Sequence, residues 1–211
     1  MASEITPQGV PRRRRKEARP GEIIEAGLAE FAARGFAAAK LDDVARRAGI
    51  AKGTIYRYFP SKEALFEAAV LSREAPLAGE VERVIDAFPG PAADLLRLVI
   101  AQLYSRLFQP DLQVLMRIVI SEGGRHPAIA AFYHRQMVAV GQRLLGRIVA
   151  RGIAGGEFRR GAVARMPMIL VAPAMMATVW KMTFDPFEPL DMETFAAAHL
   201  ELVLDGLRVR G

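Results

Sequence analysis

The chain has 211 residues, of which 52% are hydrophobic and 25% are charged, so it has a sizeable core and room for one or two domains. It contains no cysteine, which excludes disulfides, thiolate metal sites and cysteine nucleophiles. The net charge is +6, and residues 1–70 hold 13 Lys and Arg against 9 Asp and Glu, so positive charge is concentrated at the amino end.

Residues 1–19 are predicted to form a flexible basic arm. Pro7, Gly9 and Pro11 interrupt any local periodicity, and a cationic tract follows them: Arg12, Arg13, Arg14, Arg15 and Lys16. Such a tract suits an arm that follows the minor groove of DNA, but a solvated tail would steepen the salt dependence of binding in the same way. Because this polar start lacks the apolar core of a signal peptide, a cytoplasmic location is expected.

Two short amphipathic helices joined by a glycine turn are predicted between Leu41 and Phe59. In the first, acidic residues occupy the first turn and arginines the last, which suits the helix dipole, and apolar residues recur at three- and four-residue steps: Leu41, Val44, Ala45 and Ala48. Gly49 can adopt the left-handed conformation that ends a helix. The second helix is expected over residues 51–59, with Ile55 and Phe59 facing inward.

The outward face of the second short helix carries side chains that can bind DNA. They combine a lysine, a hydroxyl, two phenols and an arginine with a glycine: Lys52, Gly53, Thr54, Tyr56, Arg57 and Tyr58. These groups suit hydrogen bonds to phosphates and base edges, and Gly53 lets the backbone approach the groove floor at about 1 kcal/mol of helix propensity. Together with the basic arm, the pattern predicts a helix-turn-helix that binds duplex DNA.

The string AGIAKGTIYRYFPSKEALF, residues 48–66, is similar to the signature of the tetracycline-repressor-like (TetR) family of bacterial regulators. The resemblance covers residues 20–66 and implies a three-helix DNA-binding head whose helix at residues 51–59 enters the major groove. By position, it implies a variable contact by Arg57 and base contacts by Lys52, Gly53 and Thr54. Contacts to the phosphate backbone are implied for Lys40, Tyr56, Tyr58 and Lys62.

Three positions depart from the family's pattern. Lys40 replaces a common threonine or serine and Ala51 replaces a common serine, so each short helix lacks a hydroxyl cap worth about 1 kcal/mol. In exchange, Lys40 adds a charge that can be directed at phosphate. Gly27 stands where alanine is common in the first helix, which is expected over residues 21–34.

Residues 67–211 are predicted to be helical almost to the end, so the fold class is all-α, with a small head followed by a larger ligand-binding and dimerisation bundle. Proline and glycine clusters divide this body. One helix starts at Ser61 and passes or kinks at Pro76. The others are expected over residues 91–108, 111–122, 127–152, 162–184 and 191–208.

The last two helices are unusually apolar. The run from Met166 to Trp180 has 15 residues, which is short of the roughly 20 that a membrane-spanning helix needs. A helix that is apolar on nearly every face must be buried, either within the monomer or against a second copy. We therefore expect no membrane partner but a homodimer through these two helices, which also places two recognition helices about 34–36 Å apart for a palindromic operator.

The resemblance further implies a ligand pocket within the body. Methionines and aromatic residues with a few polar groups suit a small lipophilic effector, and the candidate lining residues are Tyr104, Phe108, Met116, Glu122, Tyr133, Met137, Met175 and Trp180. For each of them, simple core packing is the alternative. Because Glu122 is the main buried-looking acid among them, a multiply cationic effector is not expected.

No catalytic residue, metal site or cofactor is predicted. His126 and His134 are eight residues apart and lack the spacing of a metalloprotease pair. Ser121, Glu122 and His126 have no nucleophile elbow or oxyanion loop beside them. The expected function is a ligand-responsive repressor. A transcriptional activator, a DNA binder of low specificity and a helical ligand-binding protein at an anionic membrane surface stay open as alternatives.

Overall fold

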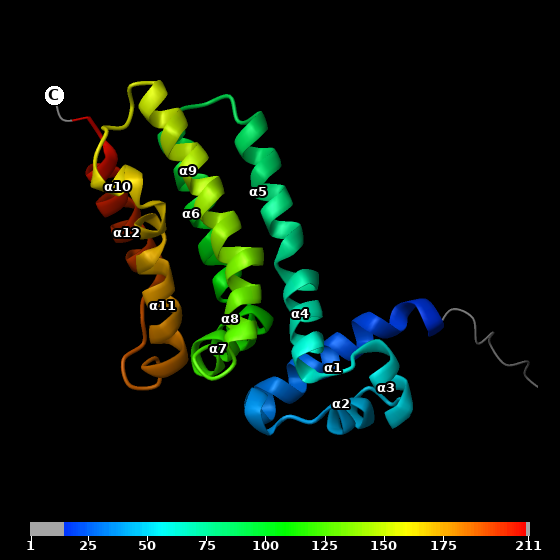
Figure 1. The fold of residues 1–211 in the computed structure, drawn as a ribbon. Helices are drawn as coiled ribbons and strands as arrows, with labels where there is room; N and C mark the ends of the chain where they lie inside the picture. Colours follow the sequence, from blue (N-terminus) through cyan, green and yellow to red (C-terminus); the bar gives the residue numbers. More distant parts are fainter. Residues whose placement is uncertain (1–14, 210–211) are drawn as a thin grey trace, which may run out of the picture. The chain divides into compact units, whose positions relative to one another are not determined.

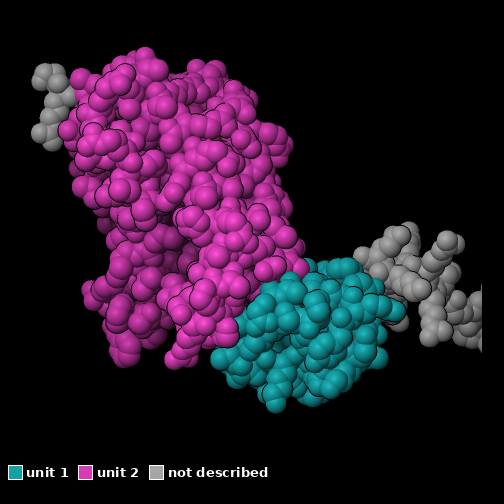
Figure 2. Space-filling view, viewed as in Figure 1, with its two compact units in different colours: residues 1–65 teal, residues 66–211 magenta. Residues whose placement is uncertain are grey.

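The computed structural model describes the backbone of residues 15–209 and the side chains of residues 20–209. Over these residues the secondary structure is helical apart from one isolated β-bridge between Phe158 and Arg208, which confirms the predicted all-α class. The chain divides into two compact units, residues 1–65 and 66–211, which Figure 2 shows in different colours. No helix in the described part of the chain is long and apolar enough to cross a membrane.

The first unit contains α1 (Arg15–Ala38), α2 (Leu41–Arg47), α3 (Lys52–Tyr58) and the start of α4 (Lys62–Arg73), shown from blue to cyan in Figure 1. The helix α1 starts at Arg15 and so takes in the last five residues of the predicted arm, whose residues are mostly good helix formers. It is kinked near its end at Gly35, where a φ of 74° favours glycine.

The core of the first unit is formed by one apolar stripe from each of its helices. Fully or almost fully buried members are Ile23, Phe31, Phe36, Val44, Ile55 and Leu65. The departure at Gly27 has a steric cause, because a β-carbon at this position would lie 2.6 Å from Cδ2 of the buried Leu65. Glycine in α1 therefore makes room for a leucine from α4.

The second unit is a bundle in which α6, α9 and α12 contribute most of the buried residues. Its helices after α4 are α5 (Ala75–Ala87), α6 (Ala92–Leu107), α7 (Pro110–Glu122), α8 (Pro127–Tyr133), α9 (Ala139–Ala154), α10 (Ala162–Arg165), α11 (Ala172–Thr183) and α12 (Met192–Leu207). The expected weak point near Pro76 is a break between α4 and α5 at Glu74, because proline is accepted in the first turn of a new helix.

Two of the predicted body helices are interrupted. The helix expected over residues 127–152 contains a π-helical turn, His134–Val138, between α8 and α9. The single helix expected over residues 162–184 is wrong: it is divided into α10, a 3₁₀ turn at Pro167–Leu170, and α11. Pro167 and Pro173 lack the N–H groups that a continuous helix needs, and Met166 has non-helical backbone angles (φ −129°, ψ 69°).

Candidate nucleic-acid interface

A tight turn between α2 and α3 sets the direction of the second helix. Gly49 has a φ of 64°, as expected for a residue that ends a helix. The N–H of Gly49 donates to the Arg46 carbonyl at 3.2 Å, and the N–H of Ile50 donates to the Ala45 carbonyl at 3.0 Å. These bonds satisfy carbonyls at the end of α2, so the chain reverses without losing backbone hydrogen bonds.

The helix α3 buries one face and exposes the other, as its sequence pattern predicts. Ile55 is fully buried and Phe59 is nearly so, which fixes the helix against the core of the unit. Of the predicted DNA contacts on this helix, Thr54 and Tyr58 are half-buried, and the exposed ones are Lys52, Gly53, Tyr56 and Arg57. The exposed face thus presents an ammonium, a phenol and a guanidinium to solvent.

One carboxylate of α2 engages two of these side chains. Lys52 Nζ lies 2.7 Å from Asp42 Oδ2, and the Tyr56 hydroxyl donates to Asp42 Oδ1 at 3.1 Å. The hydrogen bond from Lys52 lowers the pKa of Asp42, and the bond to Asp42 raises the pKa of both Lys52 and Tyr56. The sequence assigned Asp42 only to the first turn of its helix, so it did not reveal this role.

The predicted phosphate contact Lys62 is engaged within the unit. Its ammonium donates to the carbonyls of Phe36 at 2.8 Å and Ala37 at 2.9 Å, and it lies 4.7 Å from the centre of the Phe36 ring. An ammonium has three N–H donors, and two of those of Lys62 stabilise the end of α1. Lys40 is exposed at the start of α2, where it makes no capping hydrogen bond.

A buried acid whose role the sequence pattern did not predict, Glu30, joins α1 to α2. Glu30 is 3% exposed, and its two oxygens lie 3.0 Å from Arg34 Nε and 3.3 Å from Arg47 Nη2. Asp43 pairs with Arg46 at 2.9 Å on the same surface. Several arginines of this unit are therefore held by carboxylates. Arg57 in α3 is exposed, with its guanidinium 5.8 Å from the centre of the Tyr58 ring.

The predicted arm contacts cannot be located on this surface. Arg12, Arg13 and Arg14 lie outside the described residues, and for Arg15 only the backbone, at the start of α1, is described.

In the second unit, one predicted ligand residue, Tyr104, belongs to a buried polar chain, and a second, Phe108, stacks on it. The Tyr104 hydroxyl lies 2.9 Å from His199 Nδ1, and His199 Nε2 lies 3.0 Å from the Leu170 carbonyl. Phe108 stacks on Tyr104 with ring centroids 6.2 Å apart. Burial raises the pKa of Tyr104 to about 12 and lowers the pKa of His199. His199 is the polar centre of this group, because it contacts both the Tyr104 hydroxyl and the Leu170 carbonyl.

Two further predicted ligand residues, Tyr133 and Glu122, contact different partners: Tyr133 contacts an acid and Glu122 contacts a histidine. The Tyr133 hydroxyl donates to Glu74 Oε2 at 3.1 Å, and both residues are buried. Glu122 is 6% exposed, with Oε2 3.8 Å from His126 Nε2. Glu74 was not predicted as a site residue because it lies in a charged, proline-flanked segment with no apolar pattern. The second unit therefore holds two buried carboxyl groups, Glu74 and Glu122.

The remaining predicted ligand residues are partly buried. Met116 and Met137 are half-buried on α7 and in the π-helical turn, and Met175 packs against the main core of the second unit. Trp180 Nε1 donates to the Glu188 carbonyl at 2.9 Å, and its ring lies 5.2 Å from that of Phe184. These contacts do not join the eight predicted ligand residues into one set.

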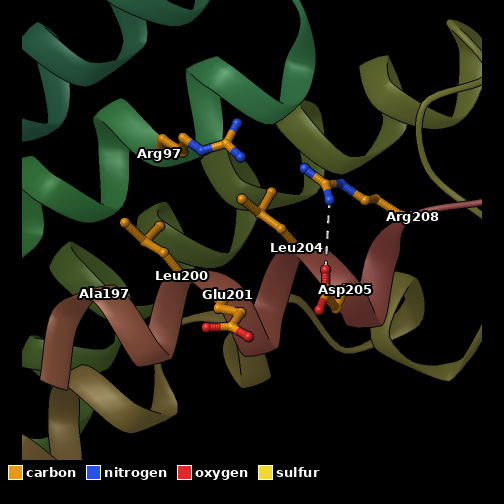
Figure 3. A pocket seen from close by; sticks show the side chains of 7 residues that line it. All are labelled: Arg97, Ala197, Leu200, Glu201, Leu204, Asp205 and Arg208. Carbon is orange, nitrogen blue, oxygen red and sulfur yellow. Dashed lines mark ion pairs between the residues drawn. The ribbon is translucent and has the colours of Figure 1, made fainter. Parts of the chain in front are cut away.

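Figure 3 shows a surface groove between α6 and α12 with a volume of about 300 Å³. Arg97 and Arg208 extend over a floor that includes Leu204, and Arg208 Nη1 lies 3.6 Å from Asp205 Oδ1. None of the eight predicted ligand residues lines this groove, whose residues are Arg97, Ala197, Leu200, Glu201, Leu204, Asp205 and Arg208. Among residues 20–209, no three His, Asp or Glu side chains are grouped so that they could hold a metal ion.

Two family models match the chain along most of its length. Residues 23–69 match the model described as bacterial regulatory proteins of the tetR family, and residues 91–198 match the model described as the tetracyclin repressor-like C-terminal domain. The chain belongs to the TetR family. This TetR-family protein is accordingly a ligand-responsive, DNA-binding transcriptional regulator, and the first match contains α2 and α3.

Relatives of this TetR-family chain match it over most of its length. It is 27% identical over 192 residues to the transcriptional repressor KstR2 of Mycolicibacterium smegmatis, covering 90% of both chains. The fold is shared with FadR of Bacillus subtilis in complex with stearoyl-CoA, at 22% identity and a TM-score of 0.73, covering 88% of this chain and 98% of FadR. It is also shared with SmeT of Stenotrophomonas maltophilia in complex with triclosan, at 22% identity and a TM-score of 0.77, covering 92% and 93% of the chains.

Proposed function

We propose that this protein is a homodimeric repressor that binds a palindromic operator and is released by a small lipophilic effector. The observation that carries the proposal is the helix α3, which buries Ile55 and exposes Lys52, Tyr56 and Arg57 on one face. Such a face can place hydrogen-bond donors in the major groove while the helix stays fixed to its unit. Residues 20–66 form the DNA-binding head in this proposal, residues 1–19 form a basic arm, and residues 67–211 bind the effector and dimerise.

The exposed apolar side chains of the last helices support dimerisation. Around α11 and α12, Met168 is 48% exposed, Ile169 51%, Met176 48% and Leu202 68%. Large apolar side chains gathered on one part of a surface favour contact with a protein partner. A second copy of the same chain is the partner that would give two α3 helices a spacing of about 34–36 Å on DNA.

The nature of the effector is supported by the relatives and by the interior of the second unit. FadR was solved with stearoyl-CoA and SmeT with triclosan, and both ligands carry large apolar groups. We place the effector among the aromatic and methionine side chains predicted above, where Tyr104 and Tyr133 supply hydroxyl groups. To release the operator, the effector must bind the released state more tightly by several kcal/mol.

Selection from random duplex DNA tests the operator-binding part of this proposal. The purified protein is incubated with a library of random duplexes at about 150 mM salt, and the bound fragments are sequenced over successive rounds. We expect a palindrome whose half-sites lie about 10–10.5 base pairs apart, or a multiple of that spacing. Enrichment without a motif would instead favour a DNA binder of low specificity. Failure to retain any duplex would contradict the proposal altogether.

A repression assay separates a repressor from an activator. The selected palindrome is placed between a promoter and a reporter gene, and transcription is measured in a purified system with and without the protein. We expect the protein to reduce transcription from this template and to leave a template with a scrambled palindrome unchanged. Increased transcription from an operator placed upstream of the promoter would identify an activator.

A further inference from the structure

Asp42 lies at the point where the recognition helix meets the rest of the head. It is the second residue of α2, yet its carboxylate binds two residues that lie one turn apart on α3, Lys52 at 2.7 Å and Tyr56 at 3.1 Å. Its side chain is 38% exposed and that of Lys52 is 70% exposed. The contact is thus on the surface that the proposed function directs at DNA.

The carboxylate of Asp42 offers Lys52 and Tyr56 the same chemistry that a phosphate offers. Both are anionic groups with oxygen acceptors close together, and both accept charge-assisted hydrogen bonds from an ammonium. While Lys52 and Tyr56 are bound to Asp42, they have less to gain from an arbitrary DNA phosphate. The negative charge of Asp42 also repels phosphates that approach this face.

We propose that Asp42 is a specificity-determining residue, because its carboxylate keeps Lys52 and Tyr56 from contacts with non-specific phosphates. The inference rests on the proposed function, in which α3 reads an operator. At the operator, bases and phosphates in the correct register replace Asp42 as partners of Lys52 and Tyr56. On random DNA the exchange is unfavourable, and Lys52 stays with Asp42.

The test compares Asp42→Asn with Asp43→Asn. Both variants remove one negative charge from the first turn of α2, but Asp43 pairs with Arg46 and Arg34 and has no described bond to α3. Fluorescence anisotropy measures the affinity of each variant for the selected operator and for a random duplex of equal length, between 50 and 300 mM salt. Thermal melting confirms that the variants are folded, and Asp42→Glu, which keeps the charge, serves as the conservative replacement.

For Asp42→Asn we expect binding to random duplex to tighten about fivefold to tenfold, and the ratio of specific to non-specific affinity to fall by a similar factor. The slope of log K against log salt concentration for random duplex should become steeper by about 1 per head, as for one added phosphate contact. Asp43→Asn and Asp42→Glu should keep the ratio within about twofold of the wild-type value. An unchanged ratio for Asp42→Asn, or an equal weakening on both duplexes, would overturn the inference.

A second comparison shows whether the effect passes through α3. In a Lys52→Ala/Tyr56→Phe background, Asp42→Asn should change the affinity ratio by less than about twofold, since the two side chains held by Asp42 are gone. A full fall of the ratio in this background would contradict the inference. If the wild-type protein binds no operator, the proposed function fails. If it binds one but Asp42→Asn leaves the affinity ratio unchanged, only the inference about Asp42 fails.

Discussion

The Tyr133 hydroxyl donates a hydrogen bond of 3.1 Å to the buried carboxyl of Glu74, at the break between α4 and α5. Burial raises the pKa of Glu74 from 4.5 to about 7, and the bond from Tyr133 opposes this rise only in part. The adjacent Arg73 binds Asp111 at 2.9 Å. Two consecutive residues thus connect this helix break to α8 and to α7.

We expect the raised pKa of Glu74 to make the protein less stable as the pH rises from about 4.5 to 7. Over this range the unfolded carboxyl loses its proton while the buried carboxyl keeps it, so the folded state binds more protons and its relative stability falls with pH. Glu74→Gln stays neutral and still accepts from Tyr133. It should be more stable than the wild type at pH 8 by up to about 3 kcal/mol and similar at pH 4. Urea unfolding at pH 4 and pH 8 measures the difference. If the stability of the wild type and of Glu74→Gln changed with pH in the same way, the raised pKa of Glu74 would be contradicted.

Lys62 is expected to contribute to stability as well as to DNA binding. Lys62→Met removes the two hydrogen bonds to the Phe36 and Ala37 carbonyls and should lower the free energy of unfolding by about 1–2 kcal/mol. It should also weaken binding to operator and random duplex by similar factors. Lys40→Met is the matched control, because it removes an exposed lysine that caps no helix. Unchanged stability of Lys62→Met would reduce its role to a phosphate contact.

Arg57 and Tyr56 should differ in what they contribute to DNA recognition. Arg57→Ala should change the preferred operator sequence, with a loss of about 1–3 kcal/mol of discrimination at one base pair, if its guanidinium reaches a base edge. Tyr56→Ala removes a proposed phosphate contact at the operator and should weaken operator binding without changing the preferred sequence. Selection from random duplexes with each variant measures both effects. Equal losses on specific and random DNA for both variants would remove Arg57 from the base-reading set.

Gly152 in α9 is expected to tolerate no side chain. A β-carbon there would overlap the ring of Phe158, which is 2% exposed and has little freedom to move. Gly152→Ala should therefore lower the free energy of unfolding by about 1–3 kcal/mol. On the same helix, the β-carbon in Gly146→Ala would lie 3.9 Å from Pro167 Cγ, and helix propensity should raise stability by up to about 1 kcal/mol. Chemical denaturation measures the free energy of unfolding of both variants. It should fall for Gly152→Ala and rise for Gly146→Ala.

The proposed dimer predicts that one exposed leucine is needed for association. Leu202→Asp places a charge on the apolar surface of α12, where the wild-type side chain is 68% exposed, and should yield a monomer at micromolar concentration. Ile120→Asp makes the same kind of change on α7, at a side chain that is 58% exposed, and should leave the assembly unchanged. Light scattering coupled to size exclusion gives the mass of each. A monomeric wild type would refute the dimer itself.

The parts of the fold that depend on local chemistry could be predicted from the sequence. Gly49 ends α2 because a positive φ is strained for any other residue type, and Ile55 and Phe59 are buried together because four residues make about one helical turn. The break near Pro76 follows from a missing N–H donor. Each of these features requires only neighbours in the sequence.

Features that depend on how helices pack could not be read from the sequence. Asp42 and Asp43 look equivalent in the first turn of α2, yet only Asp42 meets Lys52 and Tyr56, because packing turns that side of α2 toward α3. Glu74 shows no apolar pattern, but the start of a new helix at this point buries it. Between residues 162 and 184, a nearly continuous apolar composition hid the interruption by Pro167 and Pro173.

The π-helical turn at His134–Val138 allows the chain to carry one more residue than an uninterrupted α-helix would need. The turn absorbs this residue locally, so Tyr133 before it and Leu144 after it keep the orientations that bury them. A chain one residue shorter at this point would continue as a plain α-helix with the same sides turned inward. Deletion of a single residue within His134–Val138 should therefore leave both ends of this helix undisturbed.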